Sequence, residues 1–285
     1  MLNPSFTGYD GTYQASTSFR YQKPTTNIGY LLYNFSFEQS GKKRENGLGF
    51  NFRYQGDGDD GLITYSTVAV YAPSIPLFKE HLVIIPSLAF GTIWNKADWA
   101  EENVDWGDGR GPGFPPEDMN PDMYRINLDW NIGILFTHHN FIYGVGIYHD
   151  ARPNLDYGGK YFLTPKYNYH ISYVAKLRDK LKISPTFIYA KQHERKRNLP
   201  VVEDYTGSVT VQYKEKRIGI GIRNFEDVYL MLGYSSDRFT AGYSFEFQTA
   251  KAPFAGNATH EIAFNWRFGE QNLDETRKGA ELVGF

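Results

Sequence analysis

The chain has 285 residues, a net charge of −2 at pH 7 and no cysteine. The absence of cysteine excludes thiol catalysis, cysteine-ligated zinc and disulfide scaffolding, and the near-zero net charge gives no reason to expect nucleic acid. Aromatic residues reach 17%, yet the mean hydropathy is only −0.50 and no apolar run approaches the roughly 18 residues of a membrane helix. A transmembrane β-barrel reconciles these values, because its strands alternate apolar and polar residues.

Strict alternation of apolar and polar residues recurs along the chain and predicts β-strands with two different faces. It is clear in residues 13–22 and 126–134, and clearest in residues 239–248 and 261–268. The expected strands are 12–22, 27–38, 46–55, 62–71, 81–94, 123–136, 141–149, 161–176, 181–190, 205–214, 217–223, 227–235, 238–248 and 259–268. This pattern predicts an all-β, outer-membrane-type antiparallel barrel of about 14 strands, an even number as in other single-chain bacterial barrels.

Most connections between these strands alternate between short and long; the exceptions are 39–45 and 72–80, which are longer than the pattern requires, and 23–26 and 224–226, which are shorter. The short ones include 137–140, 177–180, 215–216 and 236–237, and the long ones, rich in Gly, Pro or charge, include 95–122, 150–160, 191–204 and 249–258. Outer-membrane barrels have short periplasmic turns and longer outer loops, so the alternation predicts that both termini face the periplasm. A large soluble β-sandwich is the alternative fold, and it predicts no such alternation.

We expect residues 1–268 to form one barrel domain with a short N-terminal segment, and the polar residues 269–285 to form a periplasmic tail. An outer-membrane protein must be exported, but the first residues lack the charged start and apolar run of a signal peptide. The sequence is therefore expected to be that of a mature chain.

Charged side chains on the polar strand faces are expected to point into the lumen. Arg20, Glu246, Glu261 and Arg267 lie on the first, thirteenth and fourteenth expected strands, which become neighbours where the barrel closes. These four residues could form a selectivity ring or an internal network that fills the lumen. Because buried charges must be paired and the two signs are interleaved here, the network is the favoured interpretation.

Three loops carry candidate contact residues. The connection 98–121 contains Trp99, Trp106 and Phe114 among Gly, Pro and acidic residues. Exposed aromatic residues in a long loop are good contact anchors, so these three are candidate partner-binding residues, unless the loop folds back as a plug. The loop 56–61, which contains three aspartates and three glycines, could bind Ca²⁺, although a solvated turn is favoured. The basic cluster 191–197 could face lipopolysaccharide phosphates or simply be solvated.

The sequence gives no sign of a catalytic, cofactor or metal site. His138 and His139 fall in a tight turn without a Gly-x-Ser-x-Gly motif near them. Alternation along the last strand sends His260 and Glu261 to opposite faces, so they are not expected to act as an acid–base pair. The chain is therefore predicted not to be an enzyme.

Several short segments have a recognisable order. Residues 3–8 read Asn-Pro-Ser-Phe-Thr-Gly, residues 19–23 read Phe-Arg-Tyr-Gln-Lys, residues 161–164 read Tyr-Phe-Leu-Thr, and residues 228–234, 241–245 and 259–262 follow near the end. In order and spacing these segments resemble the PorP/SprF family of Bacteroidota. That family typically shows Asn-Pro-Ala-Tyr-Ala-Gly, then Arg-x-Gln-Trp, and Gly-Ser-His-Glu-Ile before its last strand, so Lys23 departs from the pattern where Trp is usual.

The resemblance implies a non-enzymatic, multi-pass outer-membrane component of the type IX secretion system. It implies that the barrel binds, escorts or anchors the C-terminal domain of a secreted substrate, such as an adhesin of gliding motility, at the cell surface. The implied partners are that domain, other type IX secretion components, and outer-membrane lipid and lipopolysaccharide. Two alternatives stay open: a PorP-like link between the outer membrane and the periplasmic ring of the machine, and a passive or solute-specific porin.

Overall fold

The structure is a computed structural model that describes residues 3–11, 13–22, 29–40, 46–57, 62–78, 82–98, 122–154, 162–178, 180–192, 201–248 and 258–268. A short 3₁₀ helix, η1 (Pro4–Phe6), precedes the strands. The strands are β1 (Tyr13–Gln22), β2 (Tyr30–Ser40), β3 (Asn46–Asp57), β4 (Leu62–Pro73), β5 (Ile75–Leu77), β6 (Leu82–Asp98), β7 (Asp122–His138), β8 (Phe141–Tyr148), β9 (Lys166–Tyr173), β10 (Ala175–Arg178), β11 (Leu181–Gln192), β12 (Val202–Tyr213), β13 (Lys216–Arg223), β14 (Asp227–Ser235), β15 (Phe239–Gln248) and β16 (Ala258–Phe268). Within these ranges no helix is long and apolar enough to cross a membrane.

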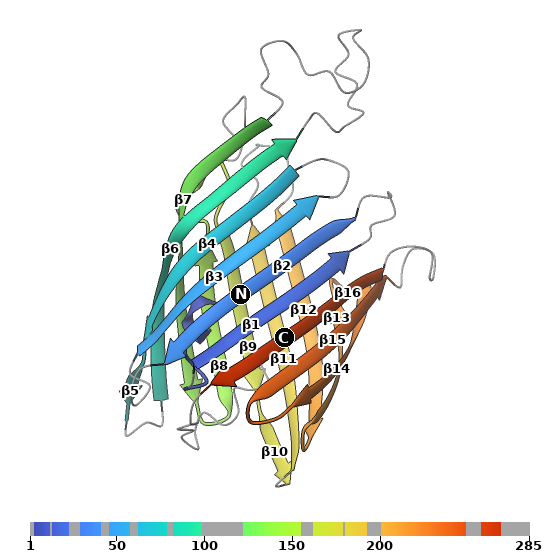
Figure 1. Cartoon of the computed structure of the whole chain (residues 1–285). Coiled ribbons are helices and arrows are strands. Elements are labelled where there is room, and N and C mark those ends of the chain that lie inside the picture. The colour runs from blue at the N-terminus through green and yellow to red at the C-terminus, as the bar shows by residue number, and fades with distance from the viewer. Residues whose placement is uncertain are drawn as a thin grey trace.

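The strands close into a single antiparallel barrel (Figure 1). The last strand, β16, pairs with β1 from Tyr13 opposite Phe268 to Gln22 opposite Thr259. The short β5 follows β4 along β6, and β10 follows β9 along β11, so the barrel has 14 strands. Closure leaves no strand at an open edge of the sheet, which lipid requires because it offers no hydrogen bonds to the backbone. The predicted fold class is confirmed.

The barrel presents its apolar side chains to the outside. Leu88 and Phe90 on β6, and Ile126 and Leu128 on β7, are each more than half exposed. The inward-facing positions between them are polar or small, and Asp129 is only 1% exposed. This inversion of the usual soluble pattern is what a hydrocarbon solvent around the barrel demands.

The strand expected over 161–176 differs from the observed structure in two details. The observed strand begins only at Lys166. Pro165 has no backbone N–H to donate to a neighbouring strand, and Leu163 donates its backbone N–H to the Pro153 carbonyl at 2.9 Å instead. The same strand is interrupted at Val174, whose N–H leaves the ladder and bonds the Asn140 carbonyl at 2.9 Å. Alternation alone does not reveal such local departures from strand pairing.

The barrel has two distinct ends. At the turn end, where β1, β3, β6, β8, β11, β13 and β15 begin, the chain reverses tightly at 139–140, 214–215 and 236–238. At the opposite end, here the loop end, β6 and β7 run to Asp98 and Asp122, which are paired in register. The connection 99–121 therefore starts and finishes on adjacent strands at the loop end.

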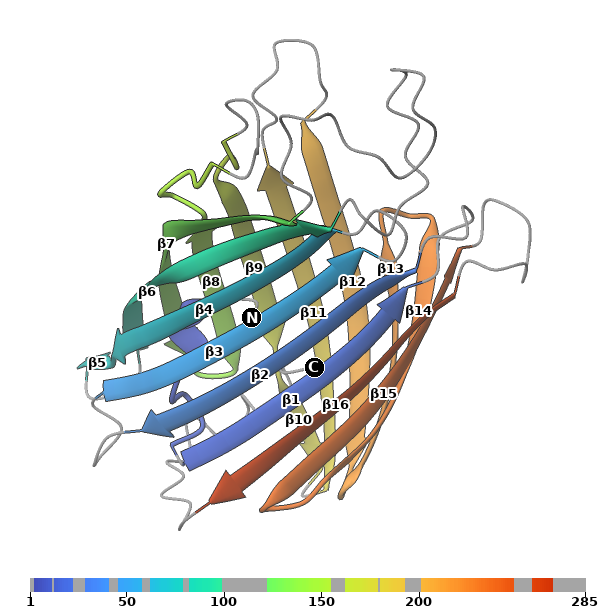
Figure 2. The same ribbon diagram turned by 45° about the horizontal axis from the view of Figure 1, so that its top comes forward.

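The N-terminal segment, residues 3–11, lies inside the ring of strands, where Figure 2 shows it in blue. The Asn3 side chain caps η1 by accepting the Ser5 N–H at 2.9 Å. Its amide nitrogen also donates to the carbonyls of Ile134 (3.2 Å) and Val145 (3.0 Å) on the barrel wall. Both Asn3 and Ser5 are completely buried, so this segment is an internal part of the barrel.

Apolar packing holds the same segment near the turn end. Tyr9 is 4% exposed, and Phe6 packs against the cluster to which Tyr9 belongs. The wall supplies the remaining members, which are Ala72, Val83, Ile85, Leu135 and Ile142. Gly8 turns the segment with a φ of +70°, and a Cβ there would lie 2.6 Å from the Gly47 Cα. Gly8 is thus required both by backbone conformation and by close approach.

Gly133 makes room for the N-terminal segment, and its substitution tests that contact. A Cβ at Gly133 would meet Asn3 Oδ1 and would lie 2.6 Å from Ser87 Oγ and 2.8 Å from Ser5 Oγ. We expect Gly133→Ala to lower the free energy of unfolding by about 1–3 kcal/mol through overpacking, measured by denaturant titration in lipid vesicles. Gly207→Ala is the matched control, because nothing lies within 4 Å of its Cβ position. Equal stability of the two variants would contradict the close contact between Gly133 and the N-terminal segment.

Candidate functional site

The lumen contains a cavity of about 870 Å³. Residues of the N-terminal segment, including Phe6, Thr7 and Tyr9, form its floor, and the lining continues to residues at the loop end of the strands, including Gln22 and Lys166. A volume of this size lies within the range of about 300–1,000 Å³ typical of ligand pockets. The lumen is therefore the candidate functional site.

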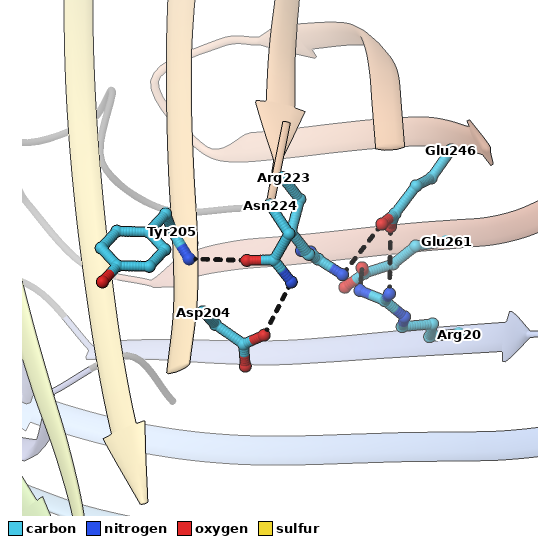
Figure 3. Close-up of polar contacts among 7 residues, drawn as sticks. All are labelled: Arg20, Asp204, Tyr205, Arg223, Asn224, Glu246 and Glu261. Carbon is cyan, nitrogen blue, oxygen red and sulfur yellow. Dashed lines mark hydrogen bonds and ion pairs between the residues drawn. The ribbon is translucent and has the colours of Figure 1, made fainter. Parts of the chain in front are cut away.

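Charged residues from four strands meet on one wall of the cavity (Figure 3). Arg20 on β1 contacts Glu246 on β15 at 3.0 Å and Glu261 on β16 at 3.7 Å. Arg223 on β13 contacts the second carboxylate oxygen of Glu246 at 2.9 Å. Glu246 therefore bridges two arginines, and the four residues form a chain of alternating charge across the closing strands.

Of the four residues predicted to form a network, the structure brings three together and not the fourth. Arg267 is 4% exposed and donates to the Ser236 carbonyl at 2.9 Å and to Thr240 Oγ1 at 3.0 Å. These partners lie at the turn end. Arg267 follows Glu261 by six positions of extended strand, which is about 20 Å at roughly 3.4 Å per residue. Alternation predicts whether a side chain points into or out of the barrel, but not its position along the barrel axis.

Arg223 was not among the predicted residues, although the sequence contains a signal for it. In β13, Ile218, Ile220 and Ile222 are exposed on the outside, so the odd-numbered positions point inward. Arg223 shares that parity and stands at the loop end of the strand, level with Arg20 and Glu246. Parity together with position along the strand would have included it.

A second cluster of polar groups lies beside the four charged residues at the loop end. The Asn224 amide donates to Asp204 Oδ1 at 3.0 Å, and its oxygen accepts the Tyr205 N–H at 2.8 Å (Figure 3). Asn224 has a φ of 51° in the tight connection between β13 and β14, a left-handed conformation that Asn tolerates better than most residues. The contact fixes the Asp204 carboxylate on the cavity wall.

The predicted loop residues Trp99, Trp106 and Phe114 lie outside the described residues, as does the tail 269–285. Most of the acidic connection 56–61 and of the basic cluster 191–197 also lies outside them. Lys191 is described and contacts Glu203 at 3.3 Å. The partner-binding role of Trp99, Trp106 and Phe114 stays a prediction.

An aromatic ladder with an acidic partner runs across the outer surface near the loop end. Tyr169 and Tyr189 stack with ring centroids 5.8 Å apart, and Tyr189 and Tyr205 stack at 4.9 Å. The hydroxyls of Tyr189 and Tyr205 both donate to the Glu203 carboxylate at 2.9 Å. Such tyrosines, with apolar rings and polar tips, are typical of the membrane–water interface of a barrel.

Two of the described histidines make separate polar contacts. His260 accepts or donates a 2.8 Å hydrogen bond with the Tyr243 hydroxyl, whereas Glu261 beside it contacts Arg20 in the lumen. His149 Nδ1 lies 2.8 Å from Asp129 Oδ2 in an isolated pair. Across the described part of the chain, no group of three His, Asp or Glu side chains is placed to hold a metal ion.

The closed antiparallel barrel, with an apolar outer surface and a polar lumen, defines an integral outer-membrane β-barrel protein. A family model described as "Type IX secretion system membrane protein PorP/SprF" matches residues 1–266, so the chain belongs to the PorP/SprF family. It is accordingly a membrane component of the type IX secretion system, located in the outer membrane. Comparison with curated proteins gives no match.

Solved structures of other outer-membrane barrels are similar in fold. The toluene transporter TodX of Pseudomonas putida has a TM-score of 0.54 at 8% identity, over 91% of this chain and 90% of that one. The CymD monoaromatic hydrocarbon channel has a TM-score of 0.51 at 10% identity, over 92% and 90% of the two chains. A FadL homologue of Pseudomonas aeruginosa has a TM-score of 0.50 at 9% identity, over 94% and 93%. At such low identity the likeness concerns the fold alone.

Proposed function

We propose that this barrel binds the C-terminal domain of a secreted substrate, such as an adhesin of gliding motility, and escorts or anchors it at the cell surface. The barrel acts by binding and carries out no catalysis. Its turn end and both termini face the periplasm, and its loop end faces the cell exterior. Membership of the PorP/SprF family supports the connection with type IX secretion, and the tight reversals at one end support the orientation.

The observation that carries this proposal is the internal position of residues 3–11. A solute channel needs a continuous path, whereas this segment packs against β4, β6 and β7 inside the lumen near the turn end. The remaining cavity extends from that floor to the loop end of the strands. A lumen that is partly occupied by the protein's own segment is better suited to holding part of a partner than to passing a solute.

The test is affinity purification of the full-length barrel from its native membrane in a mild detergent, followed by mass spectrometry. We expect a large secreted protein to be recovered through its C-terminal domain. Recovery of periplasmic ring components without any secreted protein would replace the proposal with a PorP-like link, and recovery of neither would favour a porin. Each result therefore separates the three candidate functions.

Variants at the loop end then map the contact. We expect the combined substitution Trp99→Ala, Trp106→Ala and Phe114→Ala to reduce recovery of the secreted protein by at least about tenfold, because aromatic anchors dominate protein interfaces. Phe225→Ala is the matched control, since Phe225 is 79% exposed in another connection at the same end. Unchanged recovery by the triple variant would remove these three residues from the interface.

A further inference from the structure

Two cationic side chains on the cavity wall take no part in the chain of alternating charge described above. Arg53 on β3 and Lys166 at the start of β9 both line the cavity. Among the described residues, Arg53 has one side-chain partner, the Gln55 amide oxygen at 3.1 Å, and no carboxylate lies within ion-pair distance of either cation. Guanidinium and ammonium groups facing a cavity in this way are available to an anionic ligand.

The nearby carboxylates are already committed to other groups. Glu246 accepts from both Arg20 and Arg223, and Glu261 contacts Arg20. Asp204 is held by the Asn224 amide, although it still attracts Lys166 at longer range. In the loop-end part of the cavity, four lining cations (Arg20, Arg53, Lys166 and Arg223) thus face three lining carboxylates (Asp204, Glu246 and Glu261), whereas Arg267, Asp10 and Glu38 line the turn-end part. The excess positive charge lies with Arg53 and Lys166.

The rest of the lining suits a polar, extended ligand. Amide and hydroxyl side chains cover the walls between the two cations and the ion-pair chain, among them Asn34, Asn51, Asn168, Thr206 and Ser208. These groups both donate and accept, and can therefore serve backbone amides or hydroxyls of a ligand. They line a cavity of about 870 Å³.

We infer that the lumen is a binding site for a carboxylate-bearing ligand, which Arg53 and Lys166 recognise. Arg53 can form a two-pronged contact with a carboxylate, and Lys166 supplies a second charge without a fixed direction. Two sources provide this chemistry, an extended acidic peptide segment and a small dicarboxylate solute. The identification with a segment of the secreted partner rests on the proposed function, whereas the site itself does not.

The binding test uses a fluorescein-labelled synthetic peptide of glycine, serine and glutamate, titrated with the full-length barrel in detergent and followed by fluorescence anisotropy. We expect Arg53→Gln combined with Lys166→Gln to weaken binding by about tenfold or more, and raised salt to weaken binding to the unmodified barrel. Lys191→Gln is the matched control, because Lys191 lies on the outward face of β11, contacts Glu203 and is absent from the cavity lining. A peptide with lysine in place of glutamate is expected not to bind.

Equal peptide binding by the double variant and the unmodified barrel would overturn the inference, as would absence of binding to the unmodified barrel. Migration of each variant as a folded barrel on unheated gels guards against a folding defect. Competition with glutarate identifies the source: displacement of the peptide at equal carboxylate concentration indicates a solute, and persistence of the peptide indicates an extended chain.

The partner purification distinguishes this inference from the proposed function. If the secreted protein is recovered equally with the unmodified barrel and the double variant, the proposed function stands and the lumen is not its binding site. If the peptide binds through Arg53 and Lys166 but no secreted protein is recovered, the luminal site stands and the proposed function fails.

Discussion

Deletion of residues 3–11 is expected to turn the barrel into an ion-conducting pore. Barrels of about 8 strands are filled by their own wall side chains, whereas those of about 16–18 strands enclose a water-filled channel. With 14 strands, this barrel has room for more than its own wall side chains, and the N-terminal segment occupies part of the lumen near the turn end. Single-channel recording in planar lipid bilayers should show stepwise conductance for the deletion variant and little conductance for the unmodified barrel.

The same deletion should also destabilise the barrel. It removes Tyr9 from a buried cluster, and loss of one large buried ring costs about 3–5 kcal/mol. It also leaves the carbonyls of Ile134 and Val145 without the Asn3 amide, and Glu38 without the Gly8 N–H at 3.0 Å. Denaturant titration in vesicles measures this loss independently of conductance.

A locked variant provides the control in case the deletion variant misfolds. Ser5 Oγ and Ser87 Oγ lie 2.8 Å apart, and the chain has no cysteine of its own. Ser5→Cys combined with Ser87→Cys should therefore form one disulfide that ties the N-terminal segment to β6. The oxidised variant should stay closed. Conductance from the oxidised, locked barrel would show that residues 3–11 do not close the lumen.

The sequence predicts the barrel wall far better than its contents. Strand positions follow from alternation and closure, which the bilayer imposes locally on every strand. The N-terminal segment has no such period, and its contacts reach Ser87, Ile134 and Val145, between 82 and 142 residues away. Its motif was recognisable as a family feature, but nothing local in Asn3 to Thr7 indicates burial inside the lumen. Long-range packing of this kind needs the folded barrel.

The luminal site was predictable in part for a related reason. Alternation places Arg20, Glu246 and Glu261 on the inner face, and closure makes their strands neighbours. The position of a side chain along the barrel axis depends on strand tilt and register. For this reason Arg267 lies away from the predicted charge network, whereas Arg223 belongs to it. Arg53 and Lys166 come from β3 and β9, which are not adjacent in the sheet. Their role in one cavity becomes visible only in three dimensions.

Glu246→Ala is expected to be the most destabilising single substitution in the luminal charge network. Glu246 is the one carboxylate of the described chain that bridges two arginines, Arg20 at 3.0 Å and Arg223 at 2.9 Å. Removal of one partner from a buried ion pair costs about 3–5 kcal/mol, because it leaves the other charge uncompensated. Here the side chains are 11–30% exposed to the lumen, so water screens part of the loss and we expect about 1–3 kcal/mol.

The substitution also tests how the last strands are held together. The network joins β1, β13, β15 and β16 across the closing seam, so its loss should lower the temperature at which the barrel ceases to migrate as a folded species on gels. Glu203→Ala is the matched control, since its contacts with Lys191, Tyr189 and Tyr205 all lie on the outer surface and should matter less. Exchange of the charges, Arg20→Glu with Glu246→Arg, places a second guanidinium beside Arg223 and should therefore fail to restore stability. Full recovery by this exchange would show that the bridge to Arg223 contributes nothing, and that only the Arg20 contact stabilises the seam.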